Sequence, residues 1–218
     1  YNGDFMKQSI INLLKENKLA EAIFVTGNTA IDALKTTVSK EYSHPVLEKV
    51  GNDRMILLTA HRRENLGDPM RNMFRAINRL LAEHEDVQVV YPVHMNPAVR
   101  EVANEVLGDN PRIHLIEPLE VFDFHNFAAR SFMILTDSGG VQEEAPSLGK
   151  PVLVLRDTTE RPEALASGTV RLVGTDYDKI VNEVSVLLDD KRTYDQMRRA
   201  VNPYGDGMAC ERIVNIIH

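Results

Sequence analysis

Short hydrophobic runs alternate with longer segments of helical periodicity along almost the whole chain. The runs are rich in leucine and β-branched residues and do not alternate with polar residues, which is typical of strands buried on both faces of a sheet. We therefore predict strands at residues 22–27, 54–60, 87–93, 112–118, 132–137, 151–156 and 169–174.

The segments between these runs have the apolar spacing of helices. Between residues 68 and 84, Asp68 is the expected N-cap and Pro69 suits the first helical turn. A second helix is expected between Asn96, as its cap, and Gly108, as its end. The apolar stripe of the first helix comprises Met70, Met73, Phe74, Ile77, Leu80 and Leu81, which we expect to pack in the core.

This alternation predicts an α/β fold with a doubly wound, mostly parallel sheet of the Rossmann-like type. Such sheets bind ligands beyond the carboxyl ends of their strands, where the strand order reverses. We assign residues 21–201 to one such domain. Residues 1–20 are then an N-terminal helical or interdomain segment, and residues 202–218 a C-terminal loop and helix.

Composition narrows the classes of function. The chain has 218 residues and a net charge of −7 at pH 7, so we expect no general attraction to nucleic acid or to an anionic membrane. The single Cys210 excludes an internal disulfide and, with no signal-peptide pattern, favours a cytoplasmic location. The first residue is Tyr1 rather than Met, which indicates a processed product or a piece of a longer chain.

Ser138, Gly139 and Gly140 follow the predicted strand 132–137 and precede a helical segment. Glycines let a backbone approach a bulky anion, and the first turn of a helix offers unpaired N–H groups. Two amides and the Ser138 hydroxyl could hold a diphosphate by charge-assisted hydrogen bonds. The alternative is a tight turn with a serine cap.

Two carboxylates follow the glycines. At a helical rise of 1.5 Å per residue, Glu144 lies about 6 Å along the axis from Gly140, close to the distance between a nucleotide's phosphate and its ribose diol. A carboxylate can accept both ribose hydroxyls. We therefore expect one of Glu143 and Glu144 to bind ribose and the other to be solvated.

Arg161 follows the predicted strand 151–156 and stands directly before Pro162, a residue that often opens a helix. Its guanidinium can face the same crevice, and the fork geometry suits phosphate oxygens. The alternative is a surface arginine paired with Glu160 or Glu163.

His61 and His94 each follow a predicted strand. An imidazole with a pKa near 6.5 can exchange a proton at neutral pH and so serve as a general acid or base. The sequence alone does not rank the two histidines, and either could be structural. We expect no metal site, because no carboxylate or cysteine stands at ligand spacing beside them.

Five segments together resemble the non-hydrolysing UDP-N-acetylglucosamine 2-epimerases. They are TGNTAIDAL, TAHRREN, YPVHMNP, TDSGGVQEEAPSLGKPVLVLRDTTERPEA and NPYGDGMACERI, in the family's order from about Ile23 onward. The resemblance implies the second Rossmann-like domain of a glycosyltransferase-B-like fold. It also implies UDP or UDP-N-acetylglucosamine as ligand, an N-terminal domain outside this sequence, and a homodimer for the longer protein.

By this resemblance the turn at residues 138–140 binds the UDP phosphates, Glu144 the ribose, and Arg161 the substrate. Phe124 and the backbone near Leu119 line the uracil pocket. Family members often have glutamine where Leu119 stands, which leaves only the backbone for hydrogen bonding there.

His61 corresponds to the family's functional histidine. Arg62 and His94 match residues that contact a second, regulatory UDP-N-acetylglucosamine in some bacterial members. The implied reaction interconverts UDP-N-acetylglucosamine and UDP-N-acetylmannosamine by loss and re-addition of UDP, without nicotinamide or metal. The family's proton-shuttling carboxylates belong to the first domain, so we expect this chain alone to bind UDP weakly and not to epimerise.

Three other functions stay open at this point. A UDP-sugar glycosyltransferase half would share the fold and the ribose-binding glutamate, although the HRREN segment argues against it. A nucleotide-sugar sensor would bind without turnover. A hydrolysing 2-epimerase would release free N-acetylmannosamine.

Overall fold

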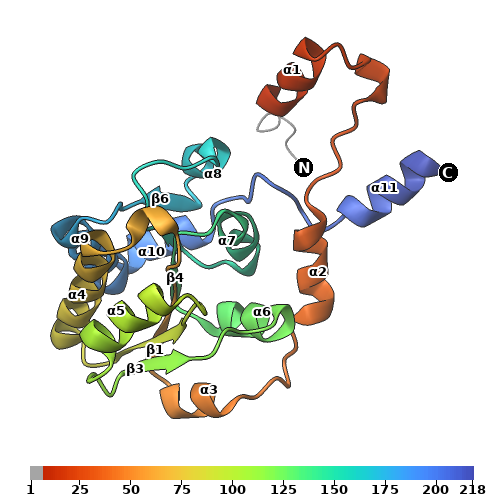
Figure 1. The fold of residues 1–218 in the computed structure, drawn as a ribbon. Helices are drawn as coiled ribbons and strands as arrows, with labels where there is room; N and C mark the ends of the chain where they lie inside the picture. The colour runs from red at the N-terminus through yellow and green to blue at the C-terminus, as the bar shows by residue number, and fades with distance from the viewer. Residues whose placement is uncertain (1–6) are drawn as a thin grey trace.

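The computed structural model describes residues 7–218. Six parallel strands form one sheet in the order β3-β2-β1-β4-β5-β6 (Figure 1). The predicted doubly wound α/β fold is confirmed, and its strand order reverses between the neighbours β1 and β4. The strands are β1 (Arg54–Thr59), β2 (Val87–Pro92), β3 (Ile113–Ile116), β4 (Met133–Thr136), β5 (Val152–Val154) and β6 (Val170–Leu172).

Helices cover both faces of the sheet. One face packs against α4, α5, α9 and α10, and the other against α2, α3, α6, α7 and α8. The helices are α1 (Lys7–Lys15), α2 (Thr29–Thr37), α3 (Pro45–Val50), α4 (Asp68–Glu83), α5 (Pro97–Leu107), α6 (Val121–Arg130), α7 (Gly139–Glu144), α8 (Pro162–Ser167), α9 (Tyr177–Asp189), α10 (Lys191–Arg198) and α11 (Ala209–Ile217), with 3-10 turns η2 (Ala20–Ala22), η3 (Arg63–Asn65) and η4 (Ala145–Leu148).

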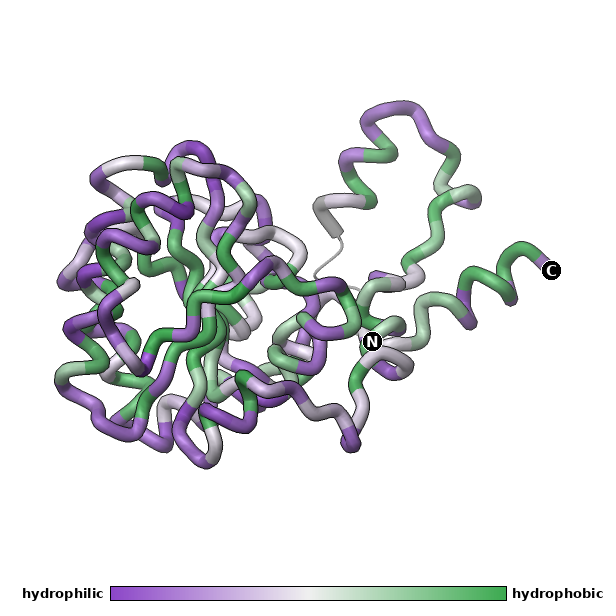
Figure 2. Tube along the Cα trace, turned by 60° about the horizontal axis from the view of Figure 1, so that its bottom comes forward, coloured by the Kyte–Doolittle hydropathy of each residue, from purple (hydrophilic) through white to green (hydrophobic). Residues whose placement is uncertain are grey.

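Successive residues of β1 pack against the helices on opposite faces of the sheet. Ile56 and Leu58 belong to the core beneath α4, whereas Met55 and Leu57 belong to the core on the opposite face. Because side chains alternate across a strand, a strand covered on both faces needs apolar residues at every position. Figure 2 shows the resulting hydrophobic interior of the sheet.

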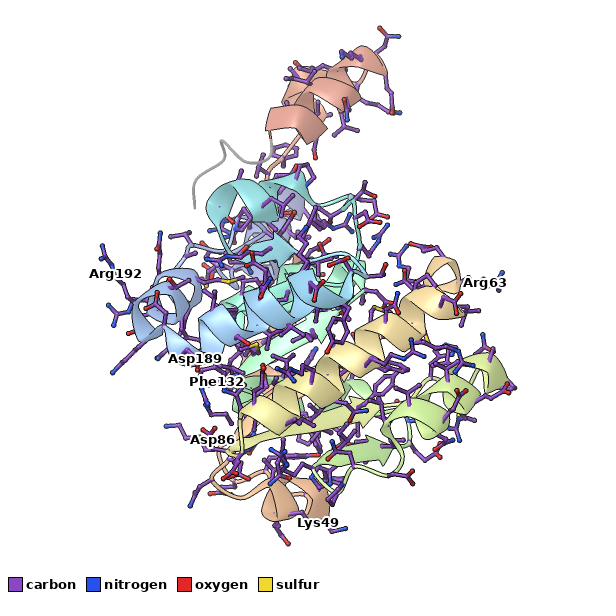
Figure 3. The ribbon with its side chains drawn as sticks, turned by 90° about the vertical axis from the view of Figure 1, so that its left-hand side faces the viewer. Lys49, Arg63, Asp86, Phe132, Asp189 and Arg192 are labelled. Carbon is purple, nitrogen blue, oxygen red and sulfur yellow. The ribbon has the colours of Figure 1, made fainter. Side chains whose placement is uncertain are left out.

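The predicted helix at residues 68–84 is confirmed as α4, and its six stripe residues are all buried. Its start differs from the prediction: Asp68 is the first helical residue and Gly67, with φ of 84°, is the N-cap. A positive φ suits glycine, so Gly67 makes the turn expected of Asp68. In Figure 3 the helix runs over the sheet from near Arg63 toward Asp86.

The second predicted helix is also confirmed. The Asn96 side chain accepts a hydrogen bond from the Ala98 N–H at 3.1 Å, and α5 ends at Gly108. Six of the predicted strands are confirmed, each one or two residues shorter at an end than expected. Some of the excess residues still bond to a neighbouring strand, as the N–H groups of Val93 and Leu155 do to the carbonyls of Ile116 and Thr136, but they lie outside the strand bounds.

The predicted strand at residues 22–27 is wrong. Ile23 is extended, with φ −105° and ψ 113°, but residues 23–28 pair with no strand and Phe24 is 57% exposed. This segment runs between α1 and α2, away from the sheet (Figure 1). Apolar and β-branched residues favour an extended backbone, but a strand also needs a neighbouring edge for its N–H and C=O groups.

The C-terminal segment returns to the N-terminal part of the chain. The Asp32 carboxylate on α2 accepts hydrogen bonds from the N–H groups of Ala209 at 3.1 Å and Cys210 at 2.7 Å, at the start of α11. Both α1 and α11 extend from the same side of the body (Figure 1). Across residues 7–218, no helix is long and apolar enough to cross a membrane.

Candidate functional site

The two loops at the switch point start side by side. Thr59 at the end of β1 pairs in register with Thr136 at the end of β4, and their hydroxyl oxygens are 2.6 Å apart. We name residues 61–67, after β1, the histidine loop, and residues 138–140, after β4, the glycine turn. Because both follow carboxyl ends of neighbouring strands, they occupy the position where such sheets bind ligands.

Asp137 joins these two loops. It is fully buried, and its Oδ2 accepts hydrogen bonds from the backbone N–H groups of His61 and Arg62, each at 2.8 Å. Its Oδ1 has no hydrogen-bond partner within the described part of the chain and lies 3.7 Å from His61 Nε2. Asp137 thus fixes the loop backbone through Oδ2, while its Oδ1 faces the imidazole. A buried carboxylate oxygen without a donor is energetically costly.

Asp137 is a site residue that was not predicted from the sequence. The available signal was a charged residue at the end of a wholly apolar run, because aspartate is almost never fully buried without partners. The structure also supplies what sequence spacing lacked, a carboxylate beside His61 from 76 residues further along the chain. Among residues 7–218, no three His, Cys, Asp or Glu side chains group so as to hold a metal ion.

His94 and Arg62 lie next to His61. The two imidazole rings are stacked, with centroids 5.3 Å apart and an interplanar angle of 26°. Arg62 Nε donates to the Asp137 carbonyl at 3.1 Å, and its guanidinium is 3.8 Å from Glu160. The His61 side chain is 41% exposed, so the stack faces solvent at the edge of the sheet.

The glycine turn leaves its donors open. The N–H groups of Gly139 and Gly140 have no acceptor among residues 7–218. Ser138 is the N-cap residue of α7, as the serine-cap alternative has it, but its hydroxyl makes no capping hydrogen bond. A Cβ built on Gly139 would meet only the Arg161 guanidinium at 3.7 Å, and one on Gly140 only Glu144 Oε1 at 3.8 Å. Both are ordinary contacts and neither φ is positive, so the fold itself does not require glycine here.

A buried glutamine connects the glycine turn to the loop that carries Arg161. Gln142 Nε2 donates to the Ser138 carbonyl at 3.1 Å, and Gln142 Oε1 accepts from the Thr159 hydroxyl at 2.6 Å. The Thr159 oxygen in turn accepts from the Arg161 N–H at 3.0 Å. These bonds set Arg161 beside the glycine turn, at the start of α8.

Glu143 is not solvated, contrary to the prediction. Its side chain is only 16% exposed, and its two carboxylate oxygens accept from Arg161 Nε and Asn28 Nδ2. The Glu143 carbonyl accepts from Asn202 Nδ2 at 2.7 Å. Arg161 therefore pairs with Glu143, and the alternative of a pair with the Glu160 or Glu163 carboxylate is wrong.

Glu144 points back toward the glycine turn. Its Oε1 lies beside Gly140 and its Oε2 is 3.4 Å from Nε2 of the buried His125. Burial raises the pKa of the Glu144 carboxyl, and the charge and hydrogen bond of His125 oppose that rise. With 23% of its side chain exposed, Glu144 keeps one oxygen open to a ligand.

Phe124 and Leu119 lie on the same side of the sheet as Glu144. Both are partly buried against the core beneath α6, Phe124 on α6 and Leu119 in the loop that precedes it. The Phe124 ring is 6.5 Å, centroid to centroid, from that of His125, which contacts Glu144. Because Phe124 directly precedes His125 in the sequence, its ring lies near the buried partner of Glu144.

Known proteins match both the sequence and the fold. The family model described as UDP-N-acetylglucosamine 2-epimerase matches residues 5–218. The UDP-N-acetylglucosamine 2-epimerase of Bacillus subtilis (strain 168) is 70% identical over 203 residues, which cover 93% of this chain and 53% of the relative. The chain spans about half the length of the curated relatives it matches.

Solved structures are also similar. A co-structure of S. aureus MnaA with UDP superposes with a TM-score of 0.92 at 55% identity, over 97% of this chain and 58% of that one. The UDP-GlcNAc 2-epimerase of Neisseria meningitidis, bound to UDP-GlcNAc, gives a TM-score of 0.87 at 42% identity, over 97% and 59%. Sequence and structure together show that this chain belongs to the UDP-N-acetylglucosamine 2-epimerase family.

Proposed function

We propose that this chain is the UDP-binding part of an isomerase that interconverts UDP-N-acetylglucosamine and UDP-N-acetylmannosamine. Family membership supports the reaction, and similar solved structures contain UDP or UDP-GlcNAc. The observation that carries the proposal is the glycine turn. Neither backbone conformation nor steric contact requires glycine at its two glycine positions, and a Cβ at either would meet only Arg161 or Glu144 side-chain atoms.

In this proposal the diphosphate occupies that space. The free N–H groups of the glycine turn and the Ser138 hydroxyl donate to its oxygens, and the Arg161 guanidinium supplies positive charge. Glu144 accepts the ribose hydroxyls. Phe124 and the backbone near Leu119 hold the uracil, since an aromatic face suits a flat base.

Stabilising the departing UDP is the catalytic task that we assign to these residues. The C2 proton leaves to a base, the C1–O bond breaks with its electron pair going to UDP, and a C1–C2 double bond forms. Return of a proton to the opposite face of C2 and re-addition of UDP at C1 complete the epimerisation. Fixed donors aimed at the developing charge favour the first step, so His61, held by Asp137, and Arg161 are the proposed catalytic side chains.

Arg62 and His94 are proposed as contacts for a regulatory UDP-sugar. The stacking of His94 on His61 supports this assignment, because a ligand that displaces His94 would also disturb His61. Arg62, already bonded to the Asp137 carbonyl, would respond to the same ligand.

The remaining length of the relatives supports a further domain. We propose that this domain supplies the carboxylates that move the C2 proton, so this chain alone does not epimerise, and that the longer protein is a cytoplasmic homodimer. Exposed apolar residues of α1 and α11, among them Leu14 and Ile217, support a covering partner on that side. Figure 2 shows α11 as a largely hydrophobic projection.

Calorimetry with UDP tests the binding role. We expect measurable affinity for wild type and at least a tenfold loss for Ser138→Ala and for Glu144→Ala, since each removes hydrogen bonds to a charged partner. Ser43→Ala, at an exposed serine between α2 and α3, is the matched control and should bind like wild type. Unchanged affinity in both site variants contradicts the proposal.

Deuterium incorporation tests the division of labour. In deuterated water, this chain with UDP-N-acetylglucosamine should leave C2 unlabelled, whereas a full-length relative such as the B. subtilis enzyme should label it. Deuterium at C2 with this chain alone would refute its proposed inactivity. Binding without label in a longer protein that contains this chain would instead favour a sensor.

A further inference from the structure

His125 is buried between two elements that the sequence does not connect. Only 5% of the residue is exposed, and both ring nitrogens have a partner. Nδ1 is 2.8 Å from the Thr37 hydroxyl at the end of α2, and Nε2 is 3.4 Å from Glu144 Oε2 at the end of α7. The series of contacts Thr37–His125–Glu144 therefore links the end of α2 to the candidate ribose position.

The Thr37 hydroxyl holds the imidazole at its Nδ1 edge. Its oxygen lies 2.9 Å from the Ala33 carbonyl and 2.8 Å from His125 Nδ1. With Nδ1 held at Thr37, the other ring nitrogen, Nε2, faces the Glu144 carboxylate.

Thr37 is itself held in place. Asn126, fully buried on α6, donates from its side chain to the Thr37 carbonyl at 2.7 Å and accepts from the Ser39 N–H at 3.0 Å. A second backbone acceptor for the same amide is the Phe122 carbonyl at 2.9 Å. The base of the chain is thus rigid, and the orientation of the imidazole is set before any ligand arrives.

We infer that His125 is a positioning residue that aims the Glu144 carboxylate at a ribose diol and thereby makes the site select ribonucleotides over deoxyribonucleotides. This rests on the proposed function, since it presupposes a uridine nucleotide in the site. With Oε2 in contact with His125 Nε2 at 3.4 Å, Oε1 stays beside Gly140 and open to hydroxyl donors. Without that contact the carboxylate can rotate and loses the fixed geometry that a diol requires.

Discrimination between UDP and 2′-deoxy-UDP tests the inference on this chain, by calorimetry or NMR titration. For wild type we expect UDP to bind about tenfold more tightly, because a hydrogen bond to a charged group is lost with the 2′-hydroxyl. His125→Phe should lower the ratio to about twofold by weakening UDP alone. His125→Gln, which retains one N–H donor, should preserve most of the ratio. His114→Phe, on the edge strand β3, is the control for replacing a histidine.

Thr37→Val provides a second route if His125→Phe does not fold, as judged by circular dichroism. It removes the hydroxyl that holds Nδ1 and should reduce the affinity ratio of UDP to 2′-deoxy-UDP by a factor of about three. The inference is overturned if His125→Phe or Thr37→Val folds and keeps the wild-type affinity ratio. It is also overturned if the affinities for UDP and 2′-deoxy-UDP fall by the same factor. Failure of wild type to bind UDP would overturn the proposed function, and this inference with it.

Discussion

The histidine loop and the glycine turn leave neighbouring strands at paired residues, yet their polar groups are used in opposite ways. In the histidine loop, the N–H groups of His61 and Arg62 are both taken by the buried carboxylate of Asp137. In the glycine turn, the N–H groups of Gly139 and Gly140 have no acceptor among residues 7–218. The backbone of the histidine loop is fixed by bonds within the protein, whereas the two glycine N–H groups of the glycine turn can donate to a ligand.

Two loops at the same edge of the sheet thus have different roles, one in holding the fold and the other in binding a ligand. A loop whose backbone is bonded internally can hold a side chain in a defined place, as Asp137 does for His61. A turn whose backbone is open can contribute the backbone itself to a ligand. Substitutions in the two loops should accordingly damage different properties.

The largest expected effect is on stability, from Asp137→Ala. This change leaves two backbone N–H groups of the histidine loop without their buried acceptor, and each such group costs about 1–3 kcal/mol. We expect the free energy of unfolding to fall by about 3 kcal/mol in urea unfolding followed by circular dichroism. Asp109→Ala, at an exposed aspartate, is the control. A loss below about 0.5 kcal/mol would show that Asp137 does not fix the loop.

The glycine turn should show the reverse pattern. Gly139→Ala and Gly140→Ala should weaken UDP binding at least tenfold, about 1.4 kcal/mol, because each Cβ enters the proposed diphosphate space. Stability should be unchanged or rise by up to about 1 kcal/mol, since alanine suits a helix start with ordinary φ better than glycine.

Gly51→Ala is the matched control for these two variants. Gly51 ends α3 with φ of 61°, far from the turn in sequence, so alanine there should cost about 1 kcal/mol of stability and leave UDP affinity alone. Equal UDP affinity in wild type and both glycine-turn variants would remove the argument that the glycines serve a ligand.

The smallest expected effect concerns pH and the ion pairs around the histidine loop. Arg156 hydrogen bonds lower the pKa of Glu160 to about 2 from 4.5, and Arg62 is 3.8 Å away. Because the folded pKa is the lower one, this stabilisation is present above pH 4.5 and is lost as the pH falls toward 2. Glu160 is largely exposed, so the contribution is below about 1 kcal/mol.

Glu160→Gln should therefore flatten the fall in stability between pH 4.5 and 2 slightly, measured by urea unfolding at several pH values. Glu85→Gln, at an exposed glutamate, should leave the pH profile as in wild type. An unchanged profile in Glu160→Gln would show that salt and solvent screen this pair completely.

The strands and main helices could be predicted because their signals are local. Ile56 to Leu58 are apolar at each position since both faces of β1 are covered, and Asn96 caps α5 through a residue only two positions away. The glycine turn was equally visible, as a strand end followed by glycines. In each case the responsible contacts are close in sequence or repeat with a simple period.

Contacts between distant residues account for what could not be predicted. The neighbours of Glu143 in the sequence indicate no contact with Asn28, which lies 115 residues away and donates to its carboxylate. Residues 22–27 have a strand-like composition and find no strand to pair with. Likewise, no sequence neighbour of His61 indicates its contact with Asp137. No sequence neighbour of Glu144 indicates its link to Thr37 through His125. Such partnerships follow from the strand order, which periodicity does not encode.

The bond between α2 and α11 has a consequence for biosynthesis. Asp32 must wait for Cys210, 178 residues later, before its carboxylate meets the amides that it caps. At 5–20 residues per second, a ribosome takes about 10–35 s to make the intervening chain. Throughout that interval the Asp32 carboxylate lacks these two donors, so this contact between α2 and α11 can form only after residues 209 and 210 have been made.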